Sequence, residues 1–341
     1  MNRTAAVLAC FAAALVVVCT LRLLATGDLG HPLGLSSDAG IMSIRATRLL
    51  SALAVGGALG AAGVILQTLL RNPLASPDVV GVSAGAGLGV MINHSLSATG
   101  VLSASLAASA AWQLVPAAVG AGAVLLLLIA AAGWTLTRSA RPAAGADPAS
   151  LLLTGVVISV LCGAGVTFLQ YFRSDSGFST ARVLAGSLSE ELSIIAAAVA
   201  AALVWVAIAL LSVLGGRSLD ALTLSHDEAV SVGVNVGRVR LLALLATGLL
   251  CAGAVVVAGP IGFVGLIAPH AVRAALGPAR ATHGPLIVAA ALAGALIVVA
   301  ADTLVRTINL AGGRMPLGIL TALAGAPTLL YLLRKDARAR H

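Results

Sequence analysis

Long apolar segments recur along the whole chain, separated by short stretches that hold most of its polar and charged residues. Each segment has about 20 residues, the length that an α-helix needs to cross the hydrocarbon core of a bilayer. Lipid offers the backbone no hydrogen-bond partner, so helices are expected, and the alternating polar residues of a membrane β-barrel are absent. The pattern predicts an all-α integral membrane protein of about ten transmembrane helices, at approximately residues 5–25, 49–70, 78–93, 113–135, 150–172, 191–214, 239–258, 261–276, 285–305 and 316–333.

Two stretches rich in glycine and proline interrupt this pattern, at Leu69–Asp78 and Gly259–His270, and each adjoins a short apolar span. Spans two to five and spans seven to ten follow one order, in which a long helix, a break and a short helix precede two long helices. The two sets lie five spans apart, an odd number, so equivalent helices run in opposite directions. Such an inverted repeat is typical of transporters.

Composition favours a membrane protein over a soluble one, because 60% of the 341 residues are hydrophobic and only 9% are charged. Ten spans put both termini on one side, and that side also receives most of the 20 basic residues, as expected of the cytoplasm. These basic residues are scattered over the loops, which does not indicate a nucleic-acid surface. We interpret residues 1–341 as one transmembrane domain, whose first span is a retained helix and not a signal peptide.

The longest segment between spans on the basic side covers residues 215–238. Ser225 and Glu228 have the spacing of a capping box, and Gly233 is a helix stop, so we expect a short helix at about 226–232. Ser218 is placed to cap a shorter helix before it. A folded element on the cytoplasmic face is a docking surface for a partner, and the alternative is a solvated connector.

Four arginines fall at equivalent places of the two repeats on the opposite, outer side: Arg45, Arg48, Arg306 and Arg314. Interfacial arginine commonly extends its head group to water without any further role. Arginine is disfavoured on the outer side, however, so an acidic partner that docks there is the other interpretation. Asp302 lies one helical turn before Arg306, and we expect the two to pair.

Several chemistries are excluded by what the chain lacks. Its one lysine is Lys335, near the end of the chain, so it contains no Walker A motif and cannot hydrolyse ATP by that route. No catalytic constellation, metal-ligand spacing or cofactor motif is found, so we predict no catalytic residue, no metal and no cofactor. A secondary transporter driven by an ion gradient is the second hypothesis, and the near absence of acidic residues and histidines within the spans argues against it.

The motifs together resemble the membrane permeases of binding-protein-dependent ABC importers (type II) for iron–siderophore complexes, haem and cobalamin. The resemblance covers about residues 40–335. It rests on Gln67-x-x-x-Arg71-Asn72-Pro73-Leu74-Ala75-x-Pro77-Asp78, on Gly259-Pro260-Ile261-Gly262-Phe263-Val264-Gly265-Leu266 with Pro269-His270, on Ala301-Asp302-Thr303-x-x-Arg306, and on Pro316-x-Gly318.

The resemblance implies a multi-pass permease subunit of the bacterial plasma (inner) membrane, most simply for a ferric siderophore, with cobalamin or haem as alternative cargo. Its implied partners are a second permease (identical or related), two cytoplasmic ATP-binding subunits that supply ATP hydrolysis, an extracytoplasmic substrate-binding protein, and membrane lipid. The implied ATPase-coupling residues are Leu219, Ala221, Leu224, His226, Asp227, Glu228 and Gly233. The implied docking residues for the binding protein are Arg45, Arg48, Arg306 and Arg314. The structural breaks are marked by Gln67, Asn72, Pro73, Pro77, Gly259, Pro260, Gly262 and Pro269.

Overall fold

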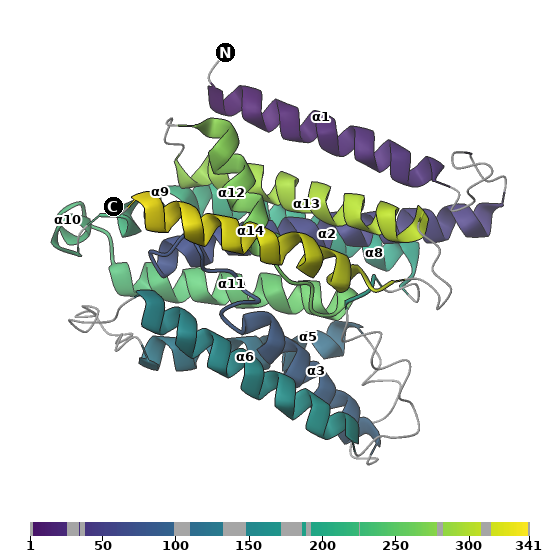
Figure 1. Ribbon diagram of the computed structural model, residues 1–341, viewed down its shortest axis with the longest axis horizontal. Helices are drawn as coiled ribbons and strands as arrows, with labels where there is room; N and C mark the ends of the chain where they lie inside the picture. Colours follow the sequence, from purple (N-terminus) through teal and green to yellow (C-terminus); the bar gives the residue numbers. More distant parts are fainter. Residues whose placement is uncertain are drawn as a thin grey trace.

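The computed structural model is an elongated bundle of α-helices that run roughly along one common direction (Figure 1). It describes residues 3–25, 34, 38–98, 110–131, 148–171, 186–188, 192–224, 226–277, 282–307 and 315–339. The helices of these residues are α1 (Arg3–Leu24), α2 (Ala39–Leu69), α3 (Val82–Ala98), α5 (Ala110–Ala131), α6 (Pro148–Tyr171), α8 (Ile194–Leu210), the π-helical turn η2 (Leu211–Gly215), α9 (Gly216–Leu222), α10 (His226–Ser231), α11 (Val236–Ala258), α12 (Val264–Leu276), α13 (His283–Thr307) and α14 (Leu317–Ala339).

Every predicted span overlaps one of these helices, which confirms the all-α class. Among the described residues, seven helices are long and apolar enough to cross a membrane, and α12 and the first part of α14 are shorter apolar helices. Ten crossings therefore stay a prediction. Helix α2 begins at Ala39, ten residues before the expected start, because Asp38 accepts a hydrogen bond from the Gly40 N–H at 2.7 Å and caps it there.

The segment between α8 and α11 holds two short helices, as expected. Helix α10 coincides with the predicted helix, and Gly233 follows it with φ of +81°, the left-handed conformation of a helix stop. Helix α9 starts at Gly216, so Ser218 lies inside it and is not its N-cap; that expectation was wrong, because the chain runs from α8 through η2 into α9 without a break. Ser225 lies outside the described residues.

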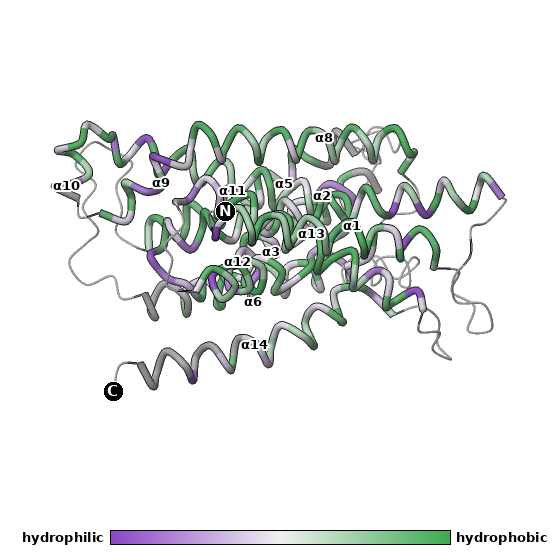
Figure 2. The backbone as a smooth tube through the Cα atoms, turned by 90° about the horizontal axis from the view of Figure 1, so that it is seen from above, coloured by the Kyte–Doolittle hydropathy of each residue, from purple (hydrophilic) through white to green (hydrophobic). Residues whose placement is uncertain are grey.

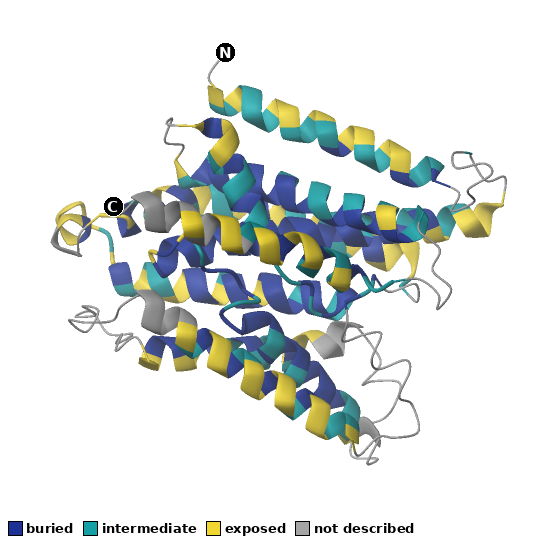
Figure 3. Cartoon of the chain, viewed as in Figure 1, coloured by how far each residue is buried: buried dark blue, intermediate teal, exposed yellow. Residues whose placement is uncertain are grey.

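The centre of the bundle is the packing of α2 against α13, which are dark in Figure 3 because most of their residues are buried. Glycines allow the close approach. A Cβ added at Gly60 would lie 2.1 Å from the carbonyl oxygen of Ala290, and one at Gly56 would lie 2.4 Å from that of Gly294. In lipid such small residues replace the hydrophobic effect as the source of helix association, since they bring the two backbones into van der Waals contact.

The periphery carries the apolar side chains that lipid would cover. Helix α1 lies along the edge of the bundle against α13, and within it only Leu15 and Arg22 are buried (Figures 1 and 3). Phe168 of α6 and Leu203 of α8 are exposed. Apolar residues follow the helices along most of their length, as the green stretches of Figure 2 show.

The start of α1, the end of α14 and the helices α9 and α10 lie toward the same end of the bundle (Figures 1 and 2). We call this the α9–α10 end. Helix α2 starts at the opposite end and finishes at the α9–α10 end. The placement agrees with the prediction that both termini and the docking segment lie on one side of the bundle. That this side faces the cytoplasm stays a prediction.

Candidate functional site

The two Gly/Pro breaks, separated by about half of the sequence, meet inside the bundle. The Oδ2 atom of Asp78, in the first break, accepts a hydrogen bond from the backbone N–H of Phe263, in the second, at 2.7 Å. Phe263 directly precedes α12, has φ of +66° and has no cap from its own side chain. The carboxylate of Asp78 therefore satisfies a free N–H at the start of α12 and places negative charge at the positive end of that helix dipole.

The first break turns the chain from α2 into α3 through local hydrogen bonds. The Oδ1 atom of Asn72 accepts from the N–H of Leu74 at 2.9 Å, which forms a side-chain turn. The carbonyl of Pro77 accepts from the N–H of Val82 at 2.7 Å, the first residue of α3. Pro73 is exposed and Pro77 is buried. The expected break residues thus hold the turn in place.

The second break is built on glycine. Gly259 ends α11 with φ of +66°, a conformation that favours glycine. A Cβ added at Gly262 would lie 3.3 Å from Oδ2 of Asp78, so a larger residue would crowd the hydrogen bond that joins the breaks. Pro260 follows Gly259 and is half-buried, and Pro269 is buried inside α12.

A second contact joins the two repeats at the end of α2. The guanidinium of Arg273 on α12 donates a hydrogen bond to Oε1 of Gln67 on α2, whose side chain is buried. Gln67 was expected only to mark the first break, and its amide binds a charged group. This hydrogen bond links the last turn of α2 to the short helix of the other repeat.

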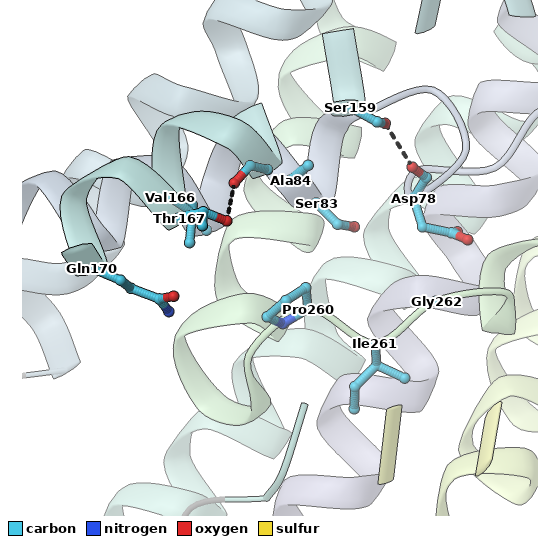
Figure 4. A pocket seen from close by; sticks show the side chains of 12 residues that line it. Asp78, Ser83, Ala84, Ser159, Val166, Thr167, Gln170, Pro260, Ile261 and Gly262 are labelled. Carbon is cyan, nitrogen blue, oxygen red and sulfur yellow. Dashed lines mark hydrogen bonds between the residues drawn. The ribbon is translucent and has the colours of Figure 1, made fainter. Parts of the chain in front are cut away.

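A cavity of about 470 Å³ opens beside the junction of the breaks. Its walls come from α3, α6 and residues 260–262, and Asp78 lies on its rim (Figure 4). Its polar residues are hydroxyls, one amide and one carboxylate. Among the described residues, no group of three or more His, Cys, Asp or Glu side chains is placed to hold a metal ion. The arrangement suits hydrogen bonding to a passing molecule better than covalent chemistry.

The predicted outer arginines are anchored in the fold. Arg48 donates to Oδ1 of Asp302 at 2.5 Å and to the carbonyl of Leu188 at 3.0 Å. The same carboxylate accepts from Arg22 of α1 at 2.6 Å. The expected pairing of Asp302 with Arg306 was wrong: α13 directs the carboxylate inward, where α1 and α2 supply its partners. We call Arg22, Arg48 and Asp302 the buried charge cluster.

The other predicted arginines take no part in this cluster where the structure describes them. Arg45 donates to the carbonyls of Leu23 and Gly34 at 2.7 and 3.1 Å and is 8% exposed. Arg306 is half-buried, and Arg314 lies outside the described residues. Several arginines therefore lie at this end, the end opposite α9 and α10, although Arg45 and Arg48 are largely enclosed by the chain itself.

The predicted coupling segment is fastened to the bundle by three side chains. Arg71, just after α2, donates to the carbonyl of Leu222 at 2.9 Å and also to that of Leu224. Asp220 of α9 pairs with Nδ1 of His283 at 2.6 Å, at the start of α13. Helix α9 therefore cannot shift without acting on the first break and on α13.

The coupling residues divide by burial. Leu219 and Ala221 are buried against the bundle, whereas Leu224, Glu228 and Gly233 are exposed. The side chains of His226 and Asp227 lie outside the described residues. The segment thus has an inner face that holds it and an outer face that a partner could contact.

Sequence reasoning missed the functional contacts of Asp78 and Arg22. Asp78 is the only acidic residue of the first break, which is the one signal that could have singled it out. Arg22 lies near the end of the predicted span 5–25, and the sequence assigned it no role. Their partners lie 185 and 280 residues away, beyond the reach of any local pattern.

Comparison with known proteins gives one consistent result. Residues 4–335 match the model of a family described as the FecCD transport family. The chain is 35% identical to the hemin transport system permease protein of Yersinia pestis, over 88% of this chain and 84% of that protein. It is 37% identical to the vitamin B12 import system permease protein of Vibrio cholerae, over 87% and 83%.

Two further comparisons extend this result. The chain is 36% identical to the Fe(3+)-citrate import system permease protein of Bacillus subtilis, over 87% of this chain and 83% of that protein. A solved metal-chelate type ABC transporter in an inward-facing conformation superposes with a TM-score of 0.73 and 27% identity, over 97% of this chain and 99% of that one. The bundle therefore has the fold of an ABC permease.

Proposed function

The chain belongs to the FecCD transport family, and from that membership we propose that it is the permease subunit of an ATP-driven importer for a ferric siderophore. It is a multi-pass membrane protein, and we place it in a bacterial inner membrane. Hydrolysis of ATP belongs to partner subunits in this proposal, because the chain has one lysine, Lys335, and no Walker A motif.

The observation that carries the proposal is the attachment of the coupling segment. Helix α9 is held by Arg71 at the end of the first break and by His283 at the start of α13, while Leu224 on its outer side is exposed. A partner that moves this segment would act directly on the two elements that meet at the centre of the bundle. A solvated connector would need no such attachment.

The proposed mechanism follows from this geometry. Two ATP-binding subunits contact the exposed side of α9 and α10 and shift them during ATP binding and hydrolysis. Arg71 and Asp220 carry the displacement to the first break and to α13. A second permease, identical or related, completes the path, and the cargo passes along α6 and α14 as the two helix bundles rock.

Cargo delivery is the task of an extracytoplasmic binding protein. We propose that it docks on the arginine-rich end, where Arg306 and Arg314 are contact residues and Arg45 and Arg48 contribute positive potential from inside the fold. Arg22 and Arg48 bind the carboxylate of Asp302, and Arg45 binds two backbone carbonyls, so these four residues together carry a net positive charge. The resulting positive field attracts acidic partner surfaces.

The relatives support metal-containing cargo, since their names cover hemin, ferric citrate and vitamin B12. We propose a ferric siderophore among these because the described lining of the cavity beside α6 carries no cationic group that would select the carboxylates of haem or citrate.

Uptake by a deletion strain tests the proposal. Cells that lack this gene should lose uptake of a radiolabelled ferric siderophore and keep uptake of cobalamin and haem. A plasmid copy should restore it, and a copy with Leu224→Gln and Val230→Gln, both exposed apolar residues of the segment, should not. The matched control is Ser231→Gln on the same helix, which should restore uptake fully. Loss of cobalamin or haem uptake instead would assign that cargo and refute the siderophore proposal.

A further inference from the structure

The cavity beside the junction of the breaks, which we call the α3–α6 pocket, has a regular wall. Ser159, Gly163, Val166 and Gln170 line it from α6 at intervals of three and four residues, so they form one face of that helix. The opposite wall is α3, and residues 260–262 of the second break close one side (Figure 4). Its volume of about 470 Å³ lies in the range of small-molecule sites.

Two polar side chains of the pocket have buried atoms that no protein group satisfies. Ser83 is 2% exposed, and its Oγ atom has no hydrogen-bond partner among the residues that the structure describes. The Nε2 atom of Gln170 is also buried without one. The other hydroxyls differ, since Ser159 donates to the carbonyl of Asp78 at 3.2 Å and Thr167 to that of Gly163 at 3.0 Å.

A buried donor without a hydrogen-bond partner is energetically unfavourable, so a bound acceptor would be favoured at Ser83 and Gln170. The same pocket offers one acceptor, the carboxylate of Asp78. None of the ion pairs among the described residues involves Asp78, so no cation neutralises it there. The pocket thus presents two donors and the carboxyl group of Asp78, which has one oxygen bound to the N–H of Phe263 and which carries negative charge when it is ionised. Amide and hydroxamate groups match the donors through their carbonyl oxygen and the acceptor through an N–H or O–H.

We propose that the α3–α6 pocket is a cargo subsite that holds an uncharged or cationic arm with amide or hydroxamate groups and disfavours carboxylates. This inference rests on the importer function proposed above and narrows its substrate to hydroxamate-type chelates. The subsite binds cargo weakly, because it offers few hydrogen bonds. Weak binding lets the cargo move along α6 and be released to the cytoplasm.

Thiol labelling of the full-length chain in nanodiscs tests the pocket directly. Gly87 and Gly163 line it, and an added Cβ at either position would meet nothing within 4 Å, so Gly87→Cys and Gly163→Cys should fold normally. The background replaces the native cysteines Cys10, Cys19, Cys162 and Cys251 by alanine. Gly215→Cys, at the α9–α10 end and equally free of contacts, is the matched control.

The rates are measured with a cationic and an anionic methanethiosulfonate of similar size, at mildly alkaline pH where carboxylates are ionised. We expect the cationic-to-anionic rate ratio at Gly163→Cys to exceed that of Gly215→Cys by about fivefold, the effect of one unit charge about 8 Å away in a water-filled pocket, which acts with opposite sign on the two reagents. Asp78→Asn should abolish this excess. Absence of labelling at both glycine positions, or a ratio that Asp78→Asn leaves unchanged, would overturn the proposal.

Protection by cargo tests the chemical class. An excess of a cationic ferric trihydroxamate should slow labelling of Gly163→Cys, and ferric citrate should not. Ser83→Ala should weaken the protection, whereas Ser95→Ala should leave it intact, because the Ser95 hydroxyl on the same helix already donates to the carbonyl of Met91 at 2.9 Å. Equal protection by ferric citrate would refute the preference for hydroxamates, and protection by neither compound would show a water-filled pocket only.

The two levels of the proposal fail separately. If the deletion strain keeps importing every cargo while labelling and protection behave as expected, the importer function is refuted and the pocket stands as a ligand site. If uptake depends on the chain and protection is absent, the subsite alone is refuted.

Discussion

At the scale of single residues, the buried charge cluster is the feature with the largest expected effect on stability. Asp302 is fully buried and binds Arg22 and Arg48, which are 2% and 7% exposed. Removing one partner of such a set leaves a charge that neither water nor protein compensates. The cluster also joins α1, α2 and α13, and together with the hydrogen bond from Arg45 to the carbonyl of Leu23 it ties the peripheral α1 to the centre of the bundle.

Asp302→Asn should therefore lower the free energy of unfolding by about 3–5 kcal/mol, because it leaves two buried guanidinium groups without their carboxylate. Denaturant unfolding in detergent micelles measures this change. The matched control is Asp38→Asn at the exposed N-cap of α2, where asparagine accepts the same hydrogen bond from Gly40 and the effect should be a few tenths of a kcal/mol. Equal small effects for both variants would contradict the importance of the cluster.

The sequence predicted individual residues only where local geometry decides their role. Asn72, Gly259 and Gly233 could be assigned to turns and helix ends, because those roles depend on neighbouring residues. The partners of Asp78 and Asp302 could not, since both carboxylates bind groups on helices far along the chain. Arg306 was a plausible local partner for Asp302. In the folded chain, however, Asp302 binds Arg22 and Arg48.

At the scale of elements, the approach of α2 to α13 depends on glycines that have no room for a side chain. Gly60→Ala would place a methyl group 2.1 Å from the carbonyl oxygen of Ala290. The two helices must separate to relieve this clash, and they lose van der Waals contacts along their length.

We expect Gly60→Ala to lower the free energy of unfolding by about 1–3 kcal/mol, which is typical of overpacking. Gly253→Ala on α11 is the control, because its added Cβ meets nothing within 4 Å. That variant should raise the free energy of unfolding by about 0.5–1 kcal/mol through helix propensity. The same unfolding measurement compares both, and a Gly60→Ala variant as stable as Gly253→Ala would refute the tight contact.

Most elements could be predicted from the sequence, and their boundaries less well. Apolar length placed every long helix, because the bilayer thickness imposes it. Apolar length did not predict the first ten residues of α2, because they precede the apolar run and include Arg45 and Arg48. The coupling helix α9 was misplaced at its start because it continues from η2, a connection that no capping signal marks.

At the scale of the whole molecule, the two breaks meet at the centre of the bundle. The predicted coupling segment is attached to that centre. The arrangement of elements agrees with the inverted repeat predicted from the sequence, in which α2, α3, α5 and α6 correspond to α11, α12, α13 and α14. The contact between Asp78 and Phe263 could be anticipated only in that both breaks were expected to be functional. The central claim is that motion enters through α9 and that the energy comes from ATPase partners.

Reconstitution into liposomes tests this claim most directly. The chain is incorporated together with the proposed ATP-binding subunits and binding protein, and accumulation of the labelled ferric chelate is followed with and without ATP. The account predicts accumulation that requires ATP and vanishes when the Walker A lysine of the ATP-binding subunit is replaced. Accumulation by the chain alone under a proton or sodium gradient, without ATPase subunits, would contradict it.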